Sequence, residues 1–311
     1  MNSILAKLKL NGFVNAGPLA LTAEEVKELT DLSQQIYLQM GHDHPDYLQF
    51  EEGVGGVRGI PQHHPRIAEL LNKLISAPEV EEVLQSVLGP VYKIWQINFR
   101  RSLPSDKGLS LHQDSPGQVN MCILLSDNSQ GDGATVFLPS THMLKERIRE
   151  LKLEASSGVF NLIRPMLTML SGRAGDVGFL FNRTWHGRTP NKTAQFQDII
   201  MLGFYPADGY LHLHTPYLNW SRDFLNSIEH TKMGLLLDPQ IGTVQESEGK
   251  YKILHTAESK NQPLPFAFEI ENLKDNDHHK TNYRLRISVA CLKFAMGSGR
   301  PFKRLLRKLK A

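Results

Sequence analysis

The hydrophobic positions of this chain follow a helical period first and a strand period later. In the first part, apolar residues recur every three or four positions within otherwise polar segments. This spacing predicts helices from Ala23 to about Met40, from Pro65 through Leu74, and from about Ser76 to a stop at Gly89.

Two short motifs support the beginnings of the first and third helices. Thr22 precedes Glu25 by three residues, and Ser76 precedes Glu79 by the same distance. In such a capping box the hydroxyl and the carboxylate satisfy backbone N–H groups that the start of a helix leaves open. We expect both motifs to be purely structural.

From about Tyr92 to Tyr205 the pattern becomes that of strands separated by turn residues. Residues 92–99 alternate, 119–125 form an apolar run, and 177–181 form a shorter one. A helical insertion is expected near Met143 to Leu153. The sequence therefore predicts a mainly β protein with flanking helices.

Length and composition favour one ordinary globular domain. The chain has 311 residues, of which 41% are hydrophobic and 22% charged, enough to bury a full core. We expect N-terminal helices over 1–90, a β core over about 91–206, an extension over 207–295 and a tail over 296–311. Two cysteines are too few for a disulfide framework, and Cys122 is expected to be a buried thiol in a core strand.

The net charge of +3 hides a strongly basic C-terminus. Residues 293–311 hold seven basic residues and no acidic one, so the rest of the chain carries a net charge of −4. A helix starting near Pro301 would place Phe302, Leu305, Leu306 and Leu309 on one face between cations. Such a helix over 300–311 suits contact with an anionic membrane surface, while docking on the protein's own body and a solvated end stay as alternatives.

The same charge distribution and the apolar segments set further expectations about partners and location. An acidic body without a basic motif predicts no nucleic-acid partner. Lysines interrupt the N-terminal segment before a signal-peptide core could form, and no apolar run is long enough to span a membrane. We expect a cytoplasmic protein, with peripheral membrane contact through the tail.

The chemistry of this chain is concentrated in His112-Gln113-Asp114 and in His186, seventy-two residues beyond the aspartate. On an extended strand, side chains two positions apart point to the same side, so His112 and Asp114 can reach one metal ion. Two imidazoles and one carboxylate are the ligands that hold non-heme Fe(II) with open coordination positions. The alternative is that these are unrelated surface and core residues.

A second copy of the triplet makes the spacing alone a weak signal. The chain has thirteen histidines, and His44-Pro45-Asp46 repeats the His-x-Asp pattern. Its proline and polar neighbours are typical of a turn. We therefore expect the metal ligands at His112 and Asp114, not at His44 and Asp46.

Several motifs in order resemble the phytanoyl-CoA dioxygenase family of Fe(II)/2-oxoglutarate oxygenases. They are Asn11–Val14, the helix from Ala23, His112–Asp114, Gly131–His142, Gly175–Val177, His186–Gly187, Asn191–Thr193 and Phe196. Together they cover roughly residues 10 to 205, and their ordered recurrence is far more specific than any one motif.

The resemblance implies a double-stranded β-helix, which is a cupin-like jelly roll of two facing sheets. It also implies that His112, Asp114 and His186 hold Fe(II), and that 2-oxoglutarate and O2 are used to hydroxylate a small-molecule, lipid or glycan substrate. Succinate and CO2 would be released.

One position departs from the family pattern. The family places an Arg on the strand after the second His to pair with the far carboxylate of 2-oxoglutarate, and here that position is Gln197. Arg188 stands where the family usually has a small residue. Its planar guanidinium could pair with the same carboxylate of 2-oxoglutarate from a different position in the chain. The alternative for Arg188 is a solvated loop residue.

Three function classes therefore stay open. The first is a 2-oxoglutarate-dependent oxygenase, which the complete His-Asp-His set favours. The second is a non-catalytic protein of the same fold, and the third is a metal-dependent isomerase or lyase that does not use 2-oxoglutarate. Gln197 is the residue that keeps the last two alternatives open.

Overall fold

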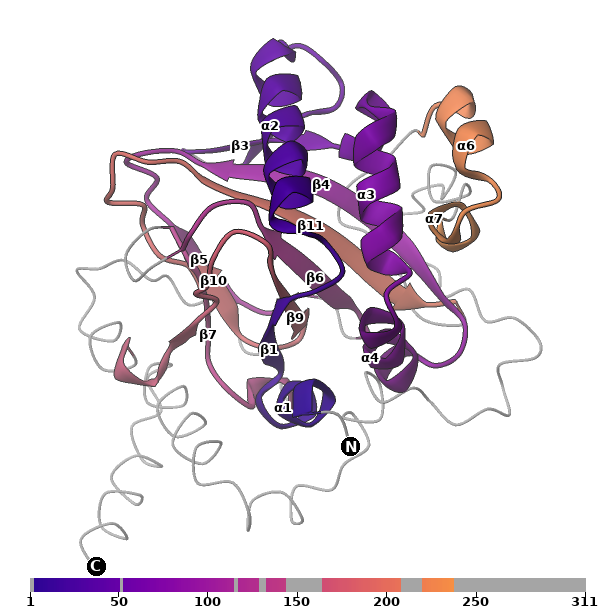
Figure 1. Cartoon of the computed structure of the whole chain (residues 1–311). Coiled ribbons are helices and arrows are strands. Elements are labelled where there is room, and N and C mark those ends of the chain that lie inside the picture. Colours follow the sequence, from indigo (N-terminus) through magenta and orange to yellow (C-terminus); the bar gives the residue numbers. More distant parts are fainter. Residues whose placement is uncertain are drawn as a thin grey trace, which may run out of the picture.

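A computed structural model of the chain describes residues 3–50, 53–114, 117–128, 133–143, 164–207 and 220–237. Within these residues the strands form a seven-stranded sheet and a four-stranded sheet, with helices on one side of the larger sheet (Figure 1). The predicted tail at 300–311, the insertion after Met143 and most of the extension from 208 onward lie outside the described residues.

Neighbouring strands of the larger sheet are antiparallel, and their order is β1-β9-β6-β11-β4-β3-β2. Its strands are β1 (Phe13–Pro18), β2 (Tyr47–Phe50), β3 (Val54–Arg58), β4 (Tyr92–Ser102), β6 (Val119–Leu124), β9 (Asp176–Phe181) and β11 (Gln197–Pro206). The smaller sheet has the order β5-β10-β7-β8, with β5 (Leu109–His112), β7 (Thr135–Phe137), β8 (Thr168–Met169) and β10 (His186–Arg188). Two facing antiparallel sheets of this kind are a double-stranded β-helix, as expected.

The helices precede and follow the strand-rich part. They are α1 (Ser3–Asn11), α2 (Ala23–Gln39), α3 (Pro65–Ile75), α4 (Pro78–Leu88), α6 (Arg222–Ile228) and α7 (Lys232–Leu236), with short 3-10 helices η1 (Ile60–His63), η2 (Thr141–Met143) and η3 (Arg164–Met166). The three helices predicted from periodicity correspond to α2, α3 and α4. The N-terminal ninety residues also supply β1, β2 and β3 to the larger sheet, which the helical pattern did not predict.

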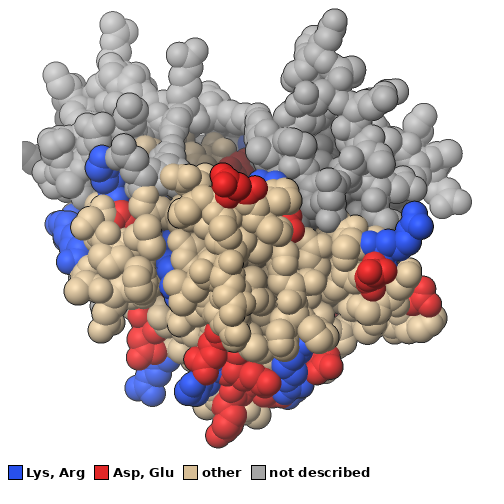
Figure 2. Space-filling model, turned by 90° about the horizontal axis from the view of Figure 1, so that it is seen from above, with Lys and Arg blue, Asp and Glu red and all other residues tan. Residues whose placement is uncertain are grey.

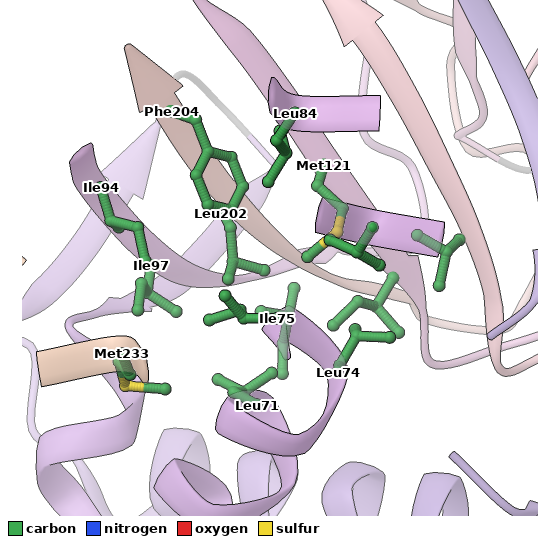
Figure 3. Close-up of a cluster of buried hydrophobic side chains, with 14 of the residues drawn as sticks. Leu71, Leu74, Ile75, Leu84, Ile94, Ile97, Met121, Leu202, Phe204 and Met233 are labelled. Carbon is green, nitrogen blue, oxygen red and sulfur yellow. The ribbon is translucent and has the colours of Figure 1, made fainter. Parts of the chain in front are cut away.

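One hydrophobic core joins the helices to the larger sheet (Figure 3). Apolar side chains of α3 and α4 pack towards apolar side chains of the central strands. The helices contribute Leu71, Leu74, Ile75 and Leu84, and the strands contribute Ile94 and Ile97 of β4, Met121 of β6, and Leu202 and Phe204 of β11. Alternate residues of the same strands, such as Cys122 and Leu124, are buried on the opposite face. Burial of both faces explains why 119–125 is apolar at every position except Asn120.

The two predicted capping boxes have different outcomes. At α2 the box is complete, because the Thr22 hydroxyl accepts from the Glu25 N–H while the Glu25 carboxylate accepts from the Thr22 N–H. At α4 the prediction was wrong: Ala77 is the N-cap and Pro78 opens the helix without a side-chain cap. Ser76 instead ends α3, where its own backbone N–H bonds to the Asn72 carbonyl.

This difference predicts different effects on stability. Thr22→Ala should lower the free energy of unfolding by about 1 kcal/mol, because an N-cap hydrogen bond is lost. Ser76→Ala is the matched control and should change it by less than about 0.5 kcal/mol, because Ser76 is exposed and caps α3 through its backbone N–H, which alanine retains. Urea denaturation of the two variants measures both values, and equal losses would contradict the assignment of the caps.

The outer surface of α2 and α3 mixes acidic and basic side chains. Arg66 contacts Glu28 and Glu69, and Lys73 contacts Glu25, at nitrogen–oxygen distances of 2.7–3.0 Å. Figure 2 shows red and blue side chains next to one another on the visible face of the described residues. No helix among the described residues has the length and apolar character needed to cross a membrane.

Candidate metal centre

The site is built where two strands of the smaller sheet meet. β5 ends at His112, β10 begins at His186, and these two residues are directly paired across the strands. The imidazole rings lie with their centroids 4.4 Å apart. Asp114 lies two residues beyond the end of β5, and its backbone N–H bonds to the carbonyl of Asn182.

Three potential ligand atoms converge on one point. Nε2 of His186 lies 3.4 Å from Oδ2 of Asp114, and Nε2 of His112 lies 3.7 Å from Oδ1 of the same carboxylate. All three ligand atoms lie within 4.8 Å of one another. Among the described residues this is the one group of three His, Cys, Asp or Glu side chains close enough to hold a metal ion.

Backbone carbonyls orient both imidazoles. Nδ1 of His112 lies 2.8 Å from the carbonyl of Ser110, and Nδ1 of His186 lies 2.7 Å from the carbonyl of Thr184. A carbonyl oxygen can only accept, so each Nδ1 carries a hydrogen, and Nε2 is the nitrogen of each ring that faces Asp114 and is available to a metal ion. Fixing the tautomer in this way is the usual outer-shell arrangement of a metal-binding histidine.

The segment that leads into His186 is anchored from several sides. Trp185 is completely buried, and its backbone N–H donates to the Thr141 hydroxyl. The Thr184 hydroxyl donates to the carbonyl of Gly12. Gly187 permits the close approach of β10 to β5, because a Cβ there would lie 2.6 Å from the carbonyl oxygen of Leu109.

The Asp114 carboxyl is held in its charged form. Burial works against ionisation, but the hydrogen bond with His186 and the charges of His186, His112 and Arg100 outweigh it and hold the pKa at about 2. The carboxyl still reaches solvent, since 44% of its side chain is exposed. Two imidazole nitrogens and one carboxylate fit a divalent metal ion in donor type.

A cavity of about 140 Å³ opens beside the three side chains, between the two sheets. Its volume is comparable with that of cavities that take up a benzene-sized molecule. The apolar part of its wall includes Val54, Leu109, Leu124, Leu180, Ile199 and Met201, and the polar part includes Gln96, Ser102, Asn120, Asn128 and Thr135. Both residues predicted to bind 2-oxoglutarate, Arg188 and Gln197, lie in this wall.

These two residues have protein partners of their own. The Arg188 guanidinium makes two bonds to the buried Asp106, from Nε to Oδ2 at 2.7 Å and from Nη2 to Oδ1 at 3.0 Å. Gln197 accepts a hydrogen bond from the Ser126 hydroxyl through its side-chain oxygen. Arg188 is thus a partly buried residue of an ion pair and not a solvated loop residue.

The second His-x-Asp triplet lies elsewhere. Asp46 contacts His63 at 3.3 Å and accepts a hydrogen bond from Gln62, while the His44 ring accepts from the Asp46 backbone N–H. These contacts stabilise the turn before β2, as the proline predicted.

The cavity also contains a residue that the sequence did not indicate, Arg100 of β4.

Comparison with known proteins agrees with this geometry. The model of the phytanoyl-CoA dioxygenase (PhyH) family matches residues 8–198. No curated protein matches the chain in sequence.

Solved structures share the fold at low sequence identity. HygX from Streptomyces hygroscopicus, with nickel, 2-oxoglutarate and hygromycin B bound, superposes with a TM-score of 0.54 at 17% identity over 72% of this chain and 94% of its own. The epimerase SnoN, in complex with Fe3+, alpha ketoglutarate and nogalamycin RO, gives a TM-score of 0.54 at 16% identity, over 70% of this chain and 90% of its own.

A third structure, EvdMO1, gives a TM-score of 0.51 at 20% identity over 66% of this chain. The chain spans about half, 49%, of the length of EvdMO1. At these identities the structures support the fold and no more.

Proposed function

Because the chain belongs to the phytanoyl-CoA dioxygenase family of Fe(II)/2-oxoglutarate-dependent oxygenases, we propose that His112, Asp114 and His186 hold its iron and that it hydroxylates a small-molecule, lipid or glycan substrate. The co-substrates are O2 and 2-oxoglutarate, and the co-products are succinate and CO2. The observation that carries this proposal is the convergence of three ligand atoms within 4.8 Å at the mouth of a cavity.

The chain's own residues have three tasks in this reaction. The carbonyls of Ser110 and Thr184 hold the two rings through Nδ1, so that both Nε2 atoms face the metal position, and the ionised Asp114 supplies a negative charge. When bound, iron and 2-oxoglutarate supply the oxidising chemistry, since the protein offers orientation and electrostatics for its cofactors. The apolar wall at Leu124, Leu180 and Met201 restricts water beside the reacting groups.

The substrate class rests on the cavity and on related structures. Hygromycin B and nogalamycin RO are bound in structures of HygX and SnoN. A cavity with a mixed polar and apolar wall is compatible with small molecules of this kind.

Succinate formation tests the proposed function. Purified protein incubated with Fe(II), ascorbate and 2-oxoglutarate should release succinate even without its true substrate, because such enzymes often turn over 2-oxoglutarate uncoupled. A chelator should suppress the release, and O2 should be required for it. Unchanged 2-oxoglutarate in the presence of bound iron would instead support the alternative that Gln197 raised, a non-catalytic or 2-oxoglutarate-independent metal-binding protein.

We also propose a cytoplasmic location, no nucleic-acid partner, and peripheral contact of residues 300–311 with anionic membranes. The support for the contact is the sequence of this segment, which has six cations around an apolar stripe. Each cation near an anionic surface contributes about 1 kcal/mol, so binding should be strong at low salt and weak at high salt.

Vesicle sedimentation tests this contact. Full-length protein should sediment with vesicles containing phosphatidylserine, and a chain truncated after Gly299 should stay in the supernatant. Equal sedimentation of both proteins would contradict the proposal.

A further inference from the structure

The wall of the cavity contains two cations among the described residues, Arg100 of β4 and Arg188 of β10. The proposed function requires a place for 2-oxoglutarate, whose second carboxylate lies at the end of the molecule away from its 2-oxo acid group. A carboxylate in a partly apolar cavity needs a charged partner or several hydrogen bonds, since an unpaired buried charge is costly. The two arginines differ in the contacts that hold their side chains, and this difference indicates which of them can bind the second carboxylate.

Arg188 is already committed to a carboxylate of the protein. Its fork binds both oxygens of Asp106, which is 1% exposed and also accepts from the Ser102 hydroxyl and the Gly108 N–H. Asp106 thereby neutralises the charge of Arg188. Turning Arg188 towards a ligand would leave a buried carboxylate without its cation, which is strongly unfavourable.

Arg100 is positioned differently, because β4 carries two consecutive arginines that face opposite sides of the sheet. Arg101 faces the helices and pairs with Asp198, whereas Arg100 faces the cavity. Burial lowers the pKa of Arg100 to about 10, while the charge of Asp114 favours its charged form and that of Arg188 opposes it. The guanidinium therefore remains charged at neutral pH and lies within electrostatic reach of the proposed iron ligands.

The backbone position of Arg100 also lies close to the position where the family pattern has its arginine. Arg100 pairs with Ile199 of β11, and the next inward-facing pair on the same two strands is Ser102 with Gln197. Diagonal neighbours on one face of a sheet are within reach of a long side chain. A guanidinium on β4 can thus serve the same part of the cavity as one on β11.

We propose that Arg100 binds the distal carboxylate of 2-oxoglutarate, with the side chain of Gln197 beside it as a neutral hydrogen-bonding group. This inference rests on the proposed function. The sequence alone suggested Arg188 as the positively charged partner of this carboxylate, whereas the structure favours Arg100.

The test compares two ligands that differ only at the far end. 2-Oxoglutarate and 2-oxopentanoate share the 2-oxo acid group and chain length, but 2-oxopentanoate lacks the second carboxylate. Each is titrated anaerobically into Fe(II)-loaded protein while the metal-to-ligand absorption is recorded, so the readout is affinity and not turnover. The parent protein should bind 2-oxoglutarate at least about tenfold more tightly, as expected for a charged hydrogen-bonded pair.

Arg100→Gln should lose this preference by weakening 2-oxoglutarate alone, while 2-oxopentanoate binds as before. Arg100→Lys should keep part of the preference, and Arg100→Gln combined with Gln197→Arg should restore it. Restoration cannot come from a misfolded protein, so it separates binding from stability. Arg66→Gln, which changes a half-buried arginine of α3 that does not line the cavity, is the matched control and should leave both affinities unchanged.

Two outcomes overturn the inference in distinguishable ways. If the parent protein prefers 2-oxoglutarate, and Arg188→Gln abolishes the preference while Arg100→Gln retains it, the anchor is Arg188 and only this inference fails. If iron-loaded parent protein binds neither oxo acid, the proposed use of 2-oxoglutarate fails with it.

Discussion

Asp114→Ala should abolish iron retention. The substitution removes the negatively charged ligand, whose two oxygens face the Nε2 atoms of His112 and His186, and leaves only the two imidazoles to bind the metal ion. Changes in the outer shell of metal sites alone typically weaken binding about 10- to 100-fold, so loss of a direct ligand should cost at least about 100-fold. The measurement is iron per chain after anaerobic loading with Fe(II) and dialysis.

The chain supplies its own control for this experiment. His44 belongs to the other His-x-Asp triplet, which lies in a turn and contacts His63 instead of the cavity. His44→Ala should therefore keep its iron, whereas His112→Ala and His186→Ala should lose it. Loss of iron in His44→Ala with retention in His112→Ala would mean that the wrong triplet has been assigned to the metal.

Asp198→Ala should cause the largest loss of stability among the changes considered. Arg101 is 4% exposed, and its guanidinium binds both oxygens of Asp198 at 2.7 and 2.8 Å, beneath the Gln34 amide of α2. Without Asp198 the cation remains buried against Tyr37 and Phe196 with no carboxylate. Breaking a buried pair from one side costs about 3–5 kcal/mol.

An exposed pair of the same type gives the comparison. Lys27 and Asp31 form an ion pair on α2 with side chains 75% and 60% exposed. Asp31→Ala should lower the free energy of unfolding by at most about 1 kcal/mol, because solvent already screens that pair. Denaturant titrations of both variants measure the difference, and similar small losses would contradict the importance of burial at Asp198.

Elements with local signals could be predicted from the sequence. The complete capping box at Thr22 and Glu25 and the periodicity of α3 are determined by residues a few positions apart. The box expected at Ser76 failed because the helix before it ends there, so that Ser76 completes α3 while Pro78 starts α4. Local patterns mark a boundary well but do not decide which of two adjoining helices uses a residue.

The strands missed in the N-terminal part depend on distant partners. β1 pairs with β9, whose residues lie more than 150 positions later in the chain. β3 contains Gly55 and Gly56, which lack the alternating side chains of a typical strand. A Cβ on Gly56 would lie 2.3 Å from the carbonyl oxygen of Phe99, so close packing on β4 requires this glycine.

In the candidate site, too, residues with a local sequence signal could be predicted, and residues that depend on distant contacts could not. His112 and Asp114 could be predicted because two positions on extended backbone share a side, and His186 because its motif resembles that of a known family. The roles of Arg100 and Asp106 could not, since they depend on contacts across the fold. Asp106 lies in a turn and is buried by Arg188, eighty-two residues away, and alternation separates Arg100 from Arg101 without saying which of them faces the cavity.

Iron-edge anomalous diffraction tests the central claim most directly, which is that one iron is held by His112, Asp114 and His186 inside the jelly roll. Crystals grown anaerobically with Fe(II) and 2-oxoglutarate should give a single strong anomalous peak between the two Nε2 atoms and the Asp114 carboxylate. A peak beside His44, His63 and Asp46, or no peak at the three side chains in protein that retains iron, would contradict the claim.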